Sequence, residues 1–189
     1  MRKVIGVLVL FVCVGGGIWM TINKMNTTEK PTERKTTQAE KTNDARSLID
    51  EIDNKIENDY PEKVKGIIDI HNDLMEICYK YPMDETAIEH YTDTIRKIYS
   101  AEFLEINPKE SQIEQLNKER QTMGEQNMEL LASNIEDVYI AQDDKGEEVS
   151  AEVNVLHGTT KGSTARTYLL IKEDGIWKIN GWKTTNVAK

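Results

Sequence analysis

The chain has 189 residues, with 33 acidic and 24 basic side chains, so its formal net charge is −9 at pH 7. This charge disfavours nucleic acid as a partner, because phosphate binding needs a basic surface. The two cysteines, Cys13 and Cys78, are too few for a disulfide framework or a cysteine-based zinc site.

An uncharged stretch, residues 4–22, follows a short basic head at residues 1–3. As a helix it would extend about 28 Å, close to the thickness of the hydrocarbon core of a bilayer. We therefore expect a single transmembrane helix over residues 4–22, retained as an uncleaved anchor. A cleaved signal peptide is the second interpretation, although its apolar region is usually shorter. A lipoprotein modified at Cys13 is the third, although Val12 before it is bulky for such processing.

The orientation of the anchor is not fixed by charge, because basic residues flank residues 4–22 on both sides. A short head followed at once by an apolar span is typical of an export signal. We therefore expect a single-pass protein of the cell membrane whose carboxy-terminal domain lies outside the cell.

Residues 23–46 are rich in Thr, Lys and Glu and contain almost no large apolar residues. A segment of this composition cannot bury enough apolar surface to fold by itself. The sequence therefore predicts a flexible stalk over residues 23–46 and one folded domain over residues 47–189.

Apolar residues recur at helical spacing in four stretches of the first half of this domain. Proline, aspartate and asparagine mark helix starts, and glycine marks a helix end. The predicted helices begin near Leu48, at Pro61, after a capping Asp84 and at Asn107–Pro108, and the fourth ends at Gly124.

From about Leu130 the apolar spacing changes to two, which is typical of β strands. Charged or glycine-containing turns at residues 143–148, 157–163 and 173–175 separate four such strands, and Gly181 predicts a bulge in the last one. Helices followed by an antiparallel meander predict an α+β domain.

The final strands read YLLIKEDGIWKINGWK, residues 168–183: an apolar strand, a charged glycine hairpin and a Trp-Lys-Ile strand. This ending after a helical half resembles the NTF2-like superfamily, which implies helices packed on a curved antiparallel sheet in the form of a cone. The whole chain also resembles small membrane-anchored proteins of Gram-positive gut bacteria that carry a domain of unknown function. The acid, base and oxyanion donor of ketosteroid isomerase-like members have no residue-by-residue match here, so the resemblance implies no catalysis.

His71 is the one histidine on the apolar stripe of the second predicted helix. In a cone, such a helix face packs into the concave sheet, and the open end of the sheet is often a pocket. His71 is therefore either a general base or a histidine of the core. Aromatic residues that could line such a pocket, or equally belong to the core, are Tyr91, Tyr168, Trp177 and Trp182. No metal or cofactor is expected, because His90 and His157 lack recognisable ligand partners and the acidic turn does not follow the EF-hand pattern.

Three functions remain open at this stage. The first is a non-catalytic anchored domain that binds a protein partner or a small apolar ligand. The second is a structural scaffold of an envelope or conjugation assembly, as in the VirB8-like proteins, which predicts a filled cone. The third is an isomerase- or dehydratase-type enzyme that uses His71 or a pocket carboxylate. The sequence does not fix the oligomeric state.

Overall fold

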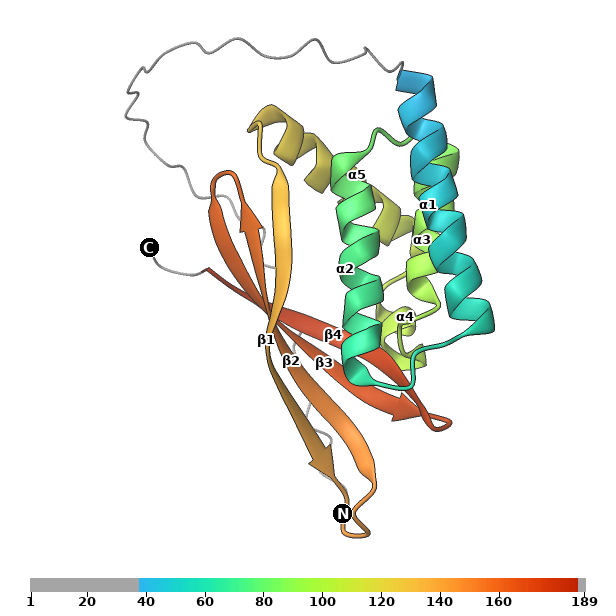
Figure 1. The fold of residues 1–189 in the computed structure, drawn as a ribbon, viewed down its shortest axis with the longest axis vertical. Coiled ribbons are helices and arrows are strands. Elements are labelled where there is room, and N and C mark those ends of the chain that lie inside the picture. Colours follow the sequence, from blue (N-terminus) through green and yellow to red (C-terminus); the bar gives the residue numbers. More distant parts are fainter. Residues whose placement is uncertain (1–37, 187–189) are drawn as a thin grey trace.

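The computed structural model describes residues 38–186, with side chains described for residues 42–184. Over this range five helices precede four strands (Figure 1). Their bounds are α1 Gln38–Asn58, α2 Val64–Lys80, α3 Glu85–Arg96, α4 Ala101–Ile106, α5 Lys109–Glu125, β1 Leu130–Gln142, β2 Glu148–Thr159, β3 Gly162–Glu173 and β4 Ile176–Asn186.

The predicted anchor at residues 4–22 and the stalk as far as residue 37 lie outside the described residues. None of the helices between residues 38 and 186 is both long enough and apolar enough to cross a membrane.

Helix α1 begins earlier than the apolar pattern predicts. It starts at Gln38, so residues 38–46 are helical rather than part of the stalk. Tertiary contacts explain the difference: the Ala45 side chain is fully buried in the core, and the Arg46 guanidinium pairs with Asp84. A polar composition does not reveal contacts of this kind.

The helix starts agree in part with the expected signals. Asp84 caps α3 as predicted, and its Oδ1 accepts a hydrogen bond of 2.9 Å from the backbone N–H of Ala87. Pro61 does not open α2, which starts three residues later at Val64. Asn107 makes no side-chain cap for α5, because Pro108 occupies the position before its first residue.

The short helix α4 was not predicted. Its six residues are too few to show a helical period, and it depends on a local cap and on one buried ring. The Ser100 hydroxyl accepts a 3.1 Å hydrogen bond from the Phe103 N–H, and Phe103 is buried.

The sheet is the expected antiparallel meander, with strand order β1-β2-β3-β4. A two-residue turn joins β3 to β4, and both Asp174 and Gly175 have positive φ, at 50° and 84°, as a tight hairpin requires. The bulge at Gly181 is confirmed, since Leu169 pairs with Gly181 while Leu170 pairs with Ile179.

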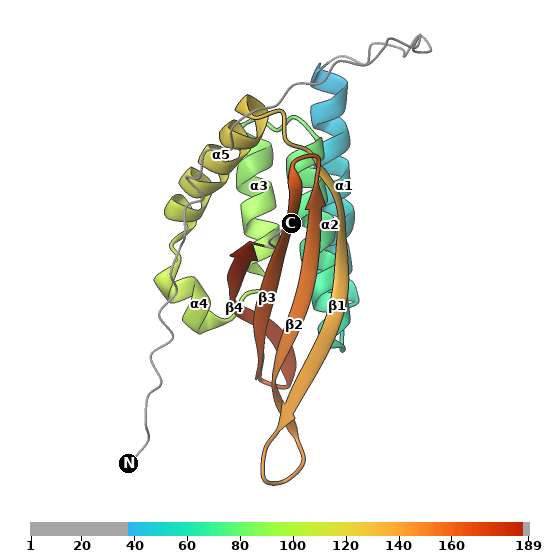
Figure 2. The ribbon, with the colours of Figure 1, turned by 90° about the vertical axis from the view of Figure 1, so that its left-hand side faces the viewer.

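The helices lie together on one face of the curved sheet, and the two layers enclose the core (Figures 1 and 2). Helix α2 contacts the sheet directly, and α1 packs on α2 and α3. Fully buried residues from both layers meet in one cluster, which includes Ile67, Ile68, Leu74, Val153, Tyr168, Leu170 and Ile179.

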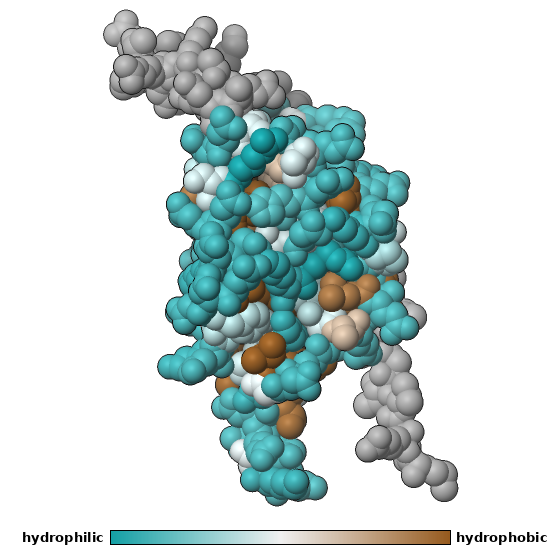
Figure 3. Space-filling view, turned by 90° about the vertical axis from the view of Figure 1, so that its right-hand side faces the viewer, coloured by the Kyte–Doolittle hydropathy of each residue, from teal (hydrophilic) through white to brown (hydrophobic). Residues whose placement is uncertain are grey.

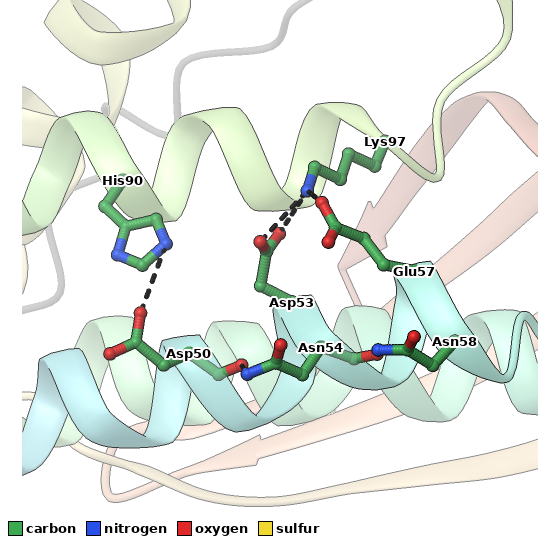
Figure 4. A network of polar contacts seen from close by, with 7 residues as sticks. All are labelled: Asp50, Asp53, Asn54, Glu57, Asn58, His90 and Lys97. Carbon is green, nitrogen blue, oxygen red and sulfur yellow. Dashed lines mark hydrogen bonds and ion pairs between the residues drawn. The ribbon is translucent and has the colours of Figure 1, made fainter.

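Polar contacts join α1 to α3 on the outside of the helical layer (Figure 4). The Lys97 ammonium lies between Asp53, at 2.8 Å, and Glu57, at 2.5 Å. His90 Nε2 lies 3.6 Å from Asp50 Oδ1, with a third of the histidine side chain exposed. His90 thus belongs to a surface contact between two helices.

Candidate functional site

His71 lies in the core, where α2 faces β3 and β4. Its side chain is 2 % exposed. The ring packs edge-on against Tyr168, with centroids 4.9 Å apart, and against Trp182, at 5.8 Å. Tyr99 and Phe103 complete this group. We call His71, Tyr99, Phe103, Tyr168 and Trp182 the aromatic cluster.

A cavity of about 90 Å³ borders the aromatic cluster. Its wall is formed by side chains of α2, α3, α5, β3 and β4 and of the segments beside α4. The residues that line it are His71, Met75, Tyr79, Tyr91, Ile95, Tyr99, Asn107, Gln112, Gln115, Leu116, Glu119, Arg166 and Trp182.

Three of the five predicted pocket residues line this cavity: His71, Tyr91 and Trp182. Tyr168 is fully buried beside His71 in the aromatic cluster. Trp177 lies elsewhere in the core, where its carbonyl accepts a hydrogen bond from Tyr60 and its ring lies 5.1 Å from the Lys172 ammonium.

Arg166 is the basic residue of the cavity that sequence reasoning missed. Its Nη1 lies 3.4 Å from the sulfur of Met75, and its Nη2 lies 3.7 Å from Glu119 Oε1. The Nε group is buried and has no hydrogen-bond partner among the described residues. The signal was available, because Arg166 shares the parity of Tyr168 and Leu170, the core face of β3.

The histidines near Arg166 are neutral at pH 7. Burial, together with the charge of Arg166 and the neighbouring His157, lowers the pKa of His71 well below its usual value. Burial and Arg166 lower the pKa of His157 to about 4. His157 lies within β2 rather than in the turn where the sequence placed it. Its Nδ1 is 2.8 Å from the Ser133 hydroxyl and its Nε2 is 3.3 Å from that of Tyr168.

Two charged side chains, Arg166 and Glu119, stand on the cavity wall with His71. In the described part of the chain, no hydrogen bond or ion pair joins His71 to a carboxylate. The one carboxylate on the cavity wall, Glu119, faces Arg166 instead. Across residues 38–186, no three His, Cys, Asp or Glu side chains gather closely enough to hold a metal ion.

A second candidate site is the end of the β1–β2 hairpin, residues 136–149, which we call the arm. Figures 1 and 2 show this hairpin extending beyond the helices. Val138 pairs with Val153 and Ile140 with Ala151, and cross-strand partners share a face of the sheet. Val138 and Ile140 therefore continue the core face of the sheet, yet they are 40 % and 44 % exposed.

The same face of the arm includes Val149, two residues before the buried Ala151, and it is 41 % exposed. Tyr139 points to the opposite face and is 60 % exposed. Seen from the helical side, the surface is mostly hydrophilic, with brown, apolar atoms in small separate groups (Figure 3). The arm therefore exposes apolar side chains on both faces.

The arm also has a free edge and a strong negative charge. Strand β1 is the first strand in the sheet order, so its outer backbone groups pair with no other described strand. The arm carries six acidic residues, Glu136, Asp137, Asp143, Asp144, Glu147 and Glu148, against the single Lys145.

A family described as a domain of unknown function, DUF6715, matches residues 1–182. The chain belongs to this family. The expected domain of unknown function is thereby confirmed, whereas the match gives no support to the NTF2-like superfamily or to a source among Gram-positive gut bacteria. No curated protein and no solved structure matches the chain. The family has no assigned activity. The candidate sites of the chain are therefore the cavity and the arm.

Proposed function

We propose that the chain is a non-catalytic, membrane-anchored domain that binds a protein partner outside the cell through the arm. One observation carries this proposal: Val138, Ile140 and Val149 extend the core face of the sheet past the ends of the helices (Figures 1 and 2). Apolar side chains gathered on an exposed face are typical of an interaction site.

The cavity beside His71 is small for a metabolite. Pockets for small organic ligands usually enclose about 300–1,000 Å³, whereas this cavity measures about 90 Å³. The interior is otherwise filled by the aromatic cluster and the aliphatic core. A small apolar ligand of ordinary metabolite size therefore finds too little space beside His71.

The arm fits an extended segment of the partner that adds a strand to the outer edge of β1. Unpaired backbone groups at a sheet edge bind such segments through main-chain hydrogen bonds, and alternate side chains give specificity. Apolar side chains would contact Val138 and Ile140, and basic ones would complement the acidic residues of the arm. A second copy of this chain would bring the same negative charge.

The position of the domain in the cell is part of the proposal. Residues 4–22 would anchor the chain in the membrane, and the cone of helices and sheet, similar to NTF2-like domains, would face outward. A scaffold role in an envelope or conjugation assembly is a narrower form of the same function, and the filled core supports it. Protease added to intact cells should degrade the domain, and protection until lysis would exclude the outward orientation.

Site-specific photo-crosslinking in the native host tests the binding function. A photoreactive amino acid replaces Ile140 in the full-length chain, and the matched control replaces Glu89, an exposed residue of α3 on the helical layer. We expect one crosslinked partner from position 140 and none from position 89. The crosslinked segment, identified by mass spectrometry, should combine basic and apolar residues.

A peptide copied from that segment should then compete for the crosslink. The double substitution Val138→Ser and Ile140→Ser, at positions already exposed, should abolish binding without loss of folded protein. Equal crosslinking from positions 140 and 89, or crosslinks only to a second copy of the chain, would contradict binding of a separate partner.

A further inference from the structure

We infer that the cavity beside Arg166 is a binding site for a small carboxylate anion of about the size of acetate, held by the guanidinium group. This inference concerns the interior of the domain. It does not depend on the partner proposed for the arm.

The Arg166 guanidinium is poorly compensated for a buried charge. Its side chain is 18 % exposed, and its one ion-pair partner, Glu119 Oε1, lies 3.7 Å from Nη2, beyond the range of a hydrogen bond. The contact at 3.4 Å is to the thioether of Met75, a weak acceptor. The Tyr168 hydroxyl accepts one further hydrogen bond from Arg166, and Nε has no partner among the described residues.

An arginine has five N–H donors, arranged as a planar fork that matches a carboxylate. A buried cation is costly unless it is paired and hydrogen-bonded. The donors of Arg166 that protein groups leave unfilled therefore favour an anion in the cavity. Hydrogen bonds between ionised groups are also stronger than neutral ones.

Two further groups on the cavity wall can donate to an anion. His71 is 2 % exposed, and its Nδ1 has no partner among the described residues. Burial and the nearby Arg166 keep its pKa low, so the ring is neutral and donates from Nδ1 in the tautomer that holds its proton there. Gln112 uses its Oε1 to accept a 3.1 Å hydrogen bond from Arg96, which leaves its NH₂ group as a donor.

The volume and the apolar walls limit the rest of the ligand. The volume of about 90 Å³ is smaller than that of a cavity of about 150 Å³, which is known to take benzene. The part of the ligand that lies inside the cavity is therefore smaller than benzene. Met75, Ile95 and Leu116 form apolar parts of the wall, which suits a short alkyl group attached to the carboxylate.

Glu119 competes with such a ligand for Arg166. It belongs to α5 and its side chain is 49 % exposed, so it stands at the rim of the cavity. A bound carboxylate would replace this long ion pair with direct hydrogen bonds inside the cavity. Removing the charge of Glu119 should therefore strengthen binding, and its exposure makes the change compatible with folding.

Binding is tested with the full-length chain in detergent, by calorimetry and by tryptophan fluorescence, because Trp182 lines the cavity. The probes are sodium acetate, neutral acetamide, bulkier benzoate and sodium chloride as an ionic-strength control. We expect saturable binding of acetate with a Kd of about 0.1–10 mM, the range open to a ligand of four heavy atoms. Acetamide lacks the charge and benzoate exceeds the cavity, so neither should bind.

Two variants test the charges of Glu119 and Arg166 separately. Glu119→Gln should tighten acetate binding about two- to fivefold, and Arg166→Lys should weaken it about tenfold, because the fork geometry is lost. Arg46→Lys, in α1 and outside the cavity wall, is the matched control and should leave the Kd unchanged.

The inference is wrong if acetate binds saturably to neither the wild type nor the Glu119→Gln variant. It is equally wrong if acetamide or chloride binds as tightly as acetate. If circular dichroism shows that Arg166→Lys does not fold, a Glu119→Gln variant with unchanged or weaker acetate affinity would overturn it in its place.

Discussion

Val138 and Val153 face each other across β1 and β2 and share one face of the sheet, yet Val138 is 40 % exposed and Val153 is fully buried. The difference comes from what lies above the face. Helices cover the sheet at Val153 and end before the arm. The pair thus marks the boundary between the core of the domain and the surface proposed to bind a partner.

Substitution of Val153 should lower the free energy of unfolding much more than substitution of Val138. Val153→Ala should lower the free energy of unfolding by about 1–3 kcal/mol, because it leaves a cavity in a filled core. Val138→Ala should change it by less than about 0.5 kcal/mol. Urea denaturation of both variants provides the comparison. A large loss at Val138 would mean that another chain covers the arm in the folded protein.

The Tyr60 hydroxyl donates a 2.8 Å hydrogen bond to the Trp177 carbonyl and ties the segment between α1 and α2 to β4. Burial, with the charge of Glu173 in addition, raises the pKa of Tyr60, so the hydroxyl keeps its proton. Tyr60→Phe should cost about 1 kcal/mol. Tyr139→Phe, at a ring that is 60 % exposed, is the control and should cost almost nothing in thermal or chemical unfolding.

Acid should weaken the fold partly through His157. Burial and Arg166 lower its pKa to about 4 in the folded protein, from about 6.5 in an unfolded chain. Between these values the unfolded state binds a proton that the folded state does not, so stability falls as the pH falls. At pH 4.5 the loss from this residue should be about 2–3 kcal/mol relative to pH 7.

The control for this effect is His157→Gln, which cannot take up the proton. Its free energy of unfolding should fall less than that of the wild type between pH 7 and 4.5, by about the amount assigned to His157. Equal losses in the two proteins would show that carboxylates alone cause the acid sensitivity.

Gly181 forms the bulge of β4 with φ of 141°, a conformation that side chains with a Cβ rarely adopt. Gly181→Ala should cost about 1–3 kcal/mol of unfolding free energy. A Cβ there would meet Phe103 only at 3.9 Å, so the cost comes from the backbone. Gly124→Ala lies in α5 with open space around it and should stabilise the protein by up to about 1 kcal/mol. Similar effects at both positions would contradict this distinction.

The sequence predicted those features that depend on neighbouring residues. The alternation of β2, the Asp84 cap, the β3–β4 hairpin and the bulge at Gly181 all follow from residue type and spacing, and the structure confirms them. Helix α4 and the early start of α1 escaped prediction, because they depend on Phe103 and Ala45 finding places in a core assembled from distant segments.

The sequence likewise predicted only part of the candidate site. Periodicity placed His71 on the core face of its helix, because the pattern of a helix reveals which residues share a side. It did not show that the ring would meet Tyr168 and Trp182, nor that Arg166 would lie beside a small cavity with Glu119 as its distant partner.

By itself, the sequence determined the fold class, the meander and the turns, since these follow from hydrophobic period and local backbone preference. Only the tertiary structure decided that the interior is nearly filled and that the sheet extends beyond its helices at Val138 and Ile140. Both depend on how far α2 extends along strands that are distant in the chain. Burial is a property of that packing and not of the residue alone.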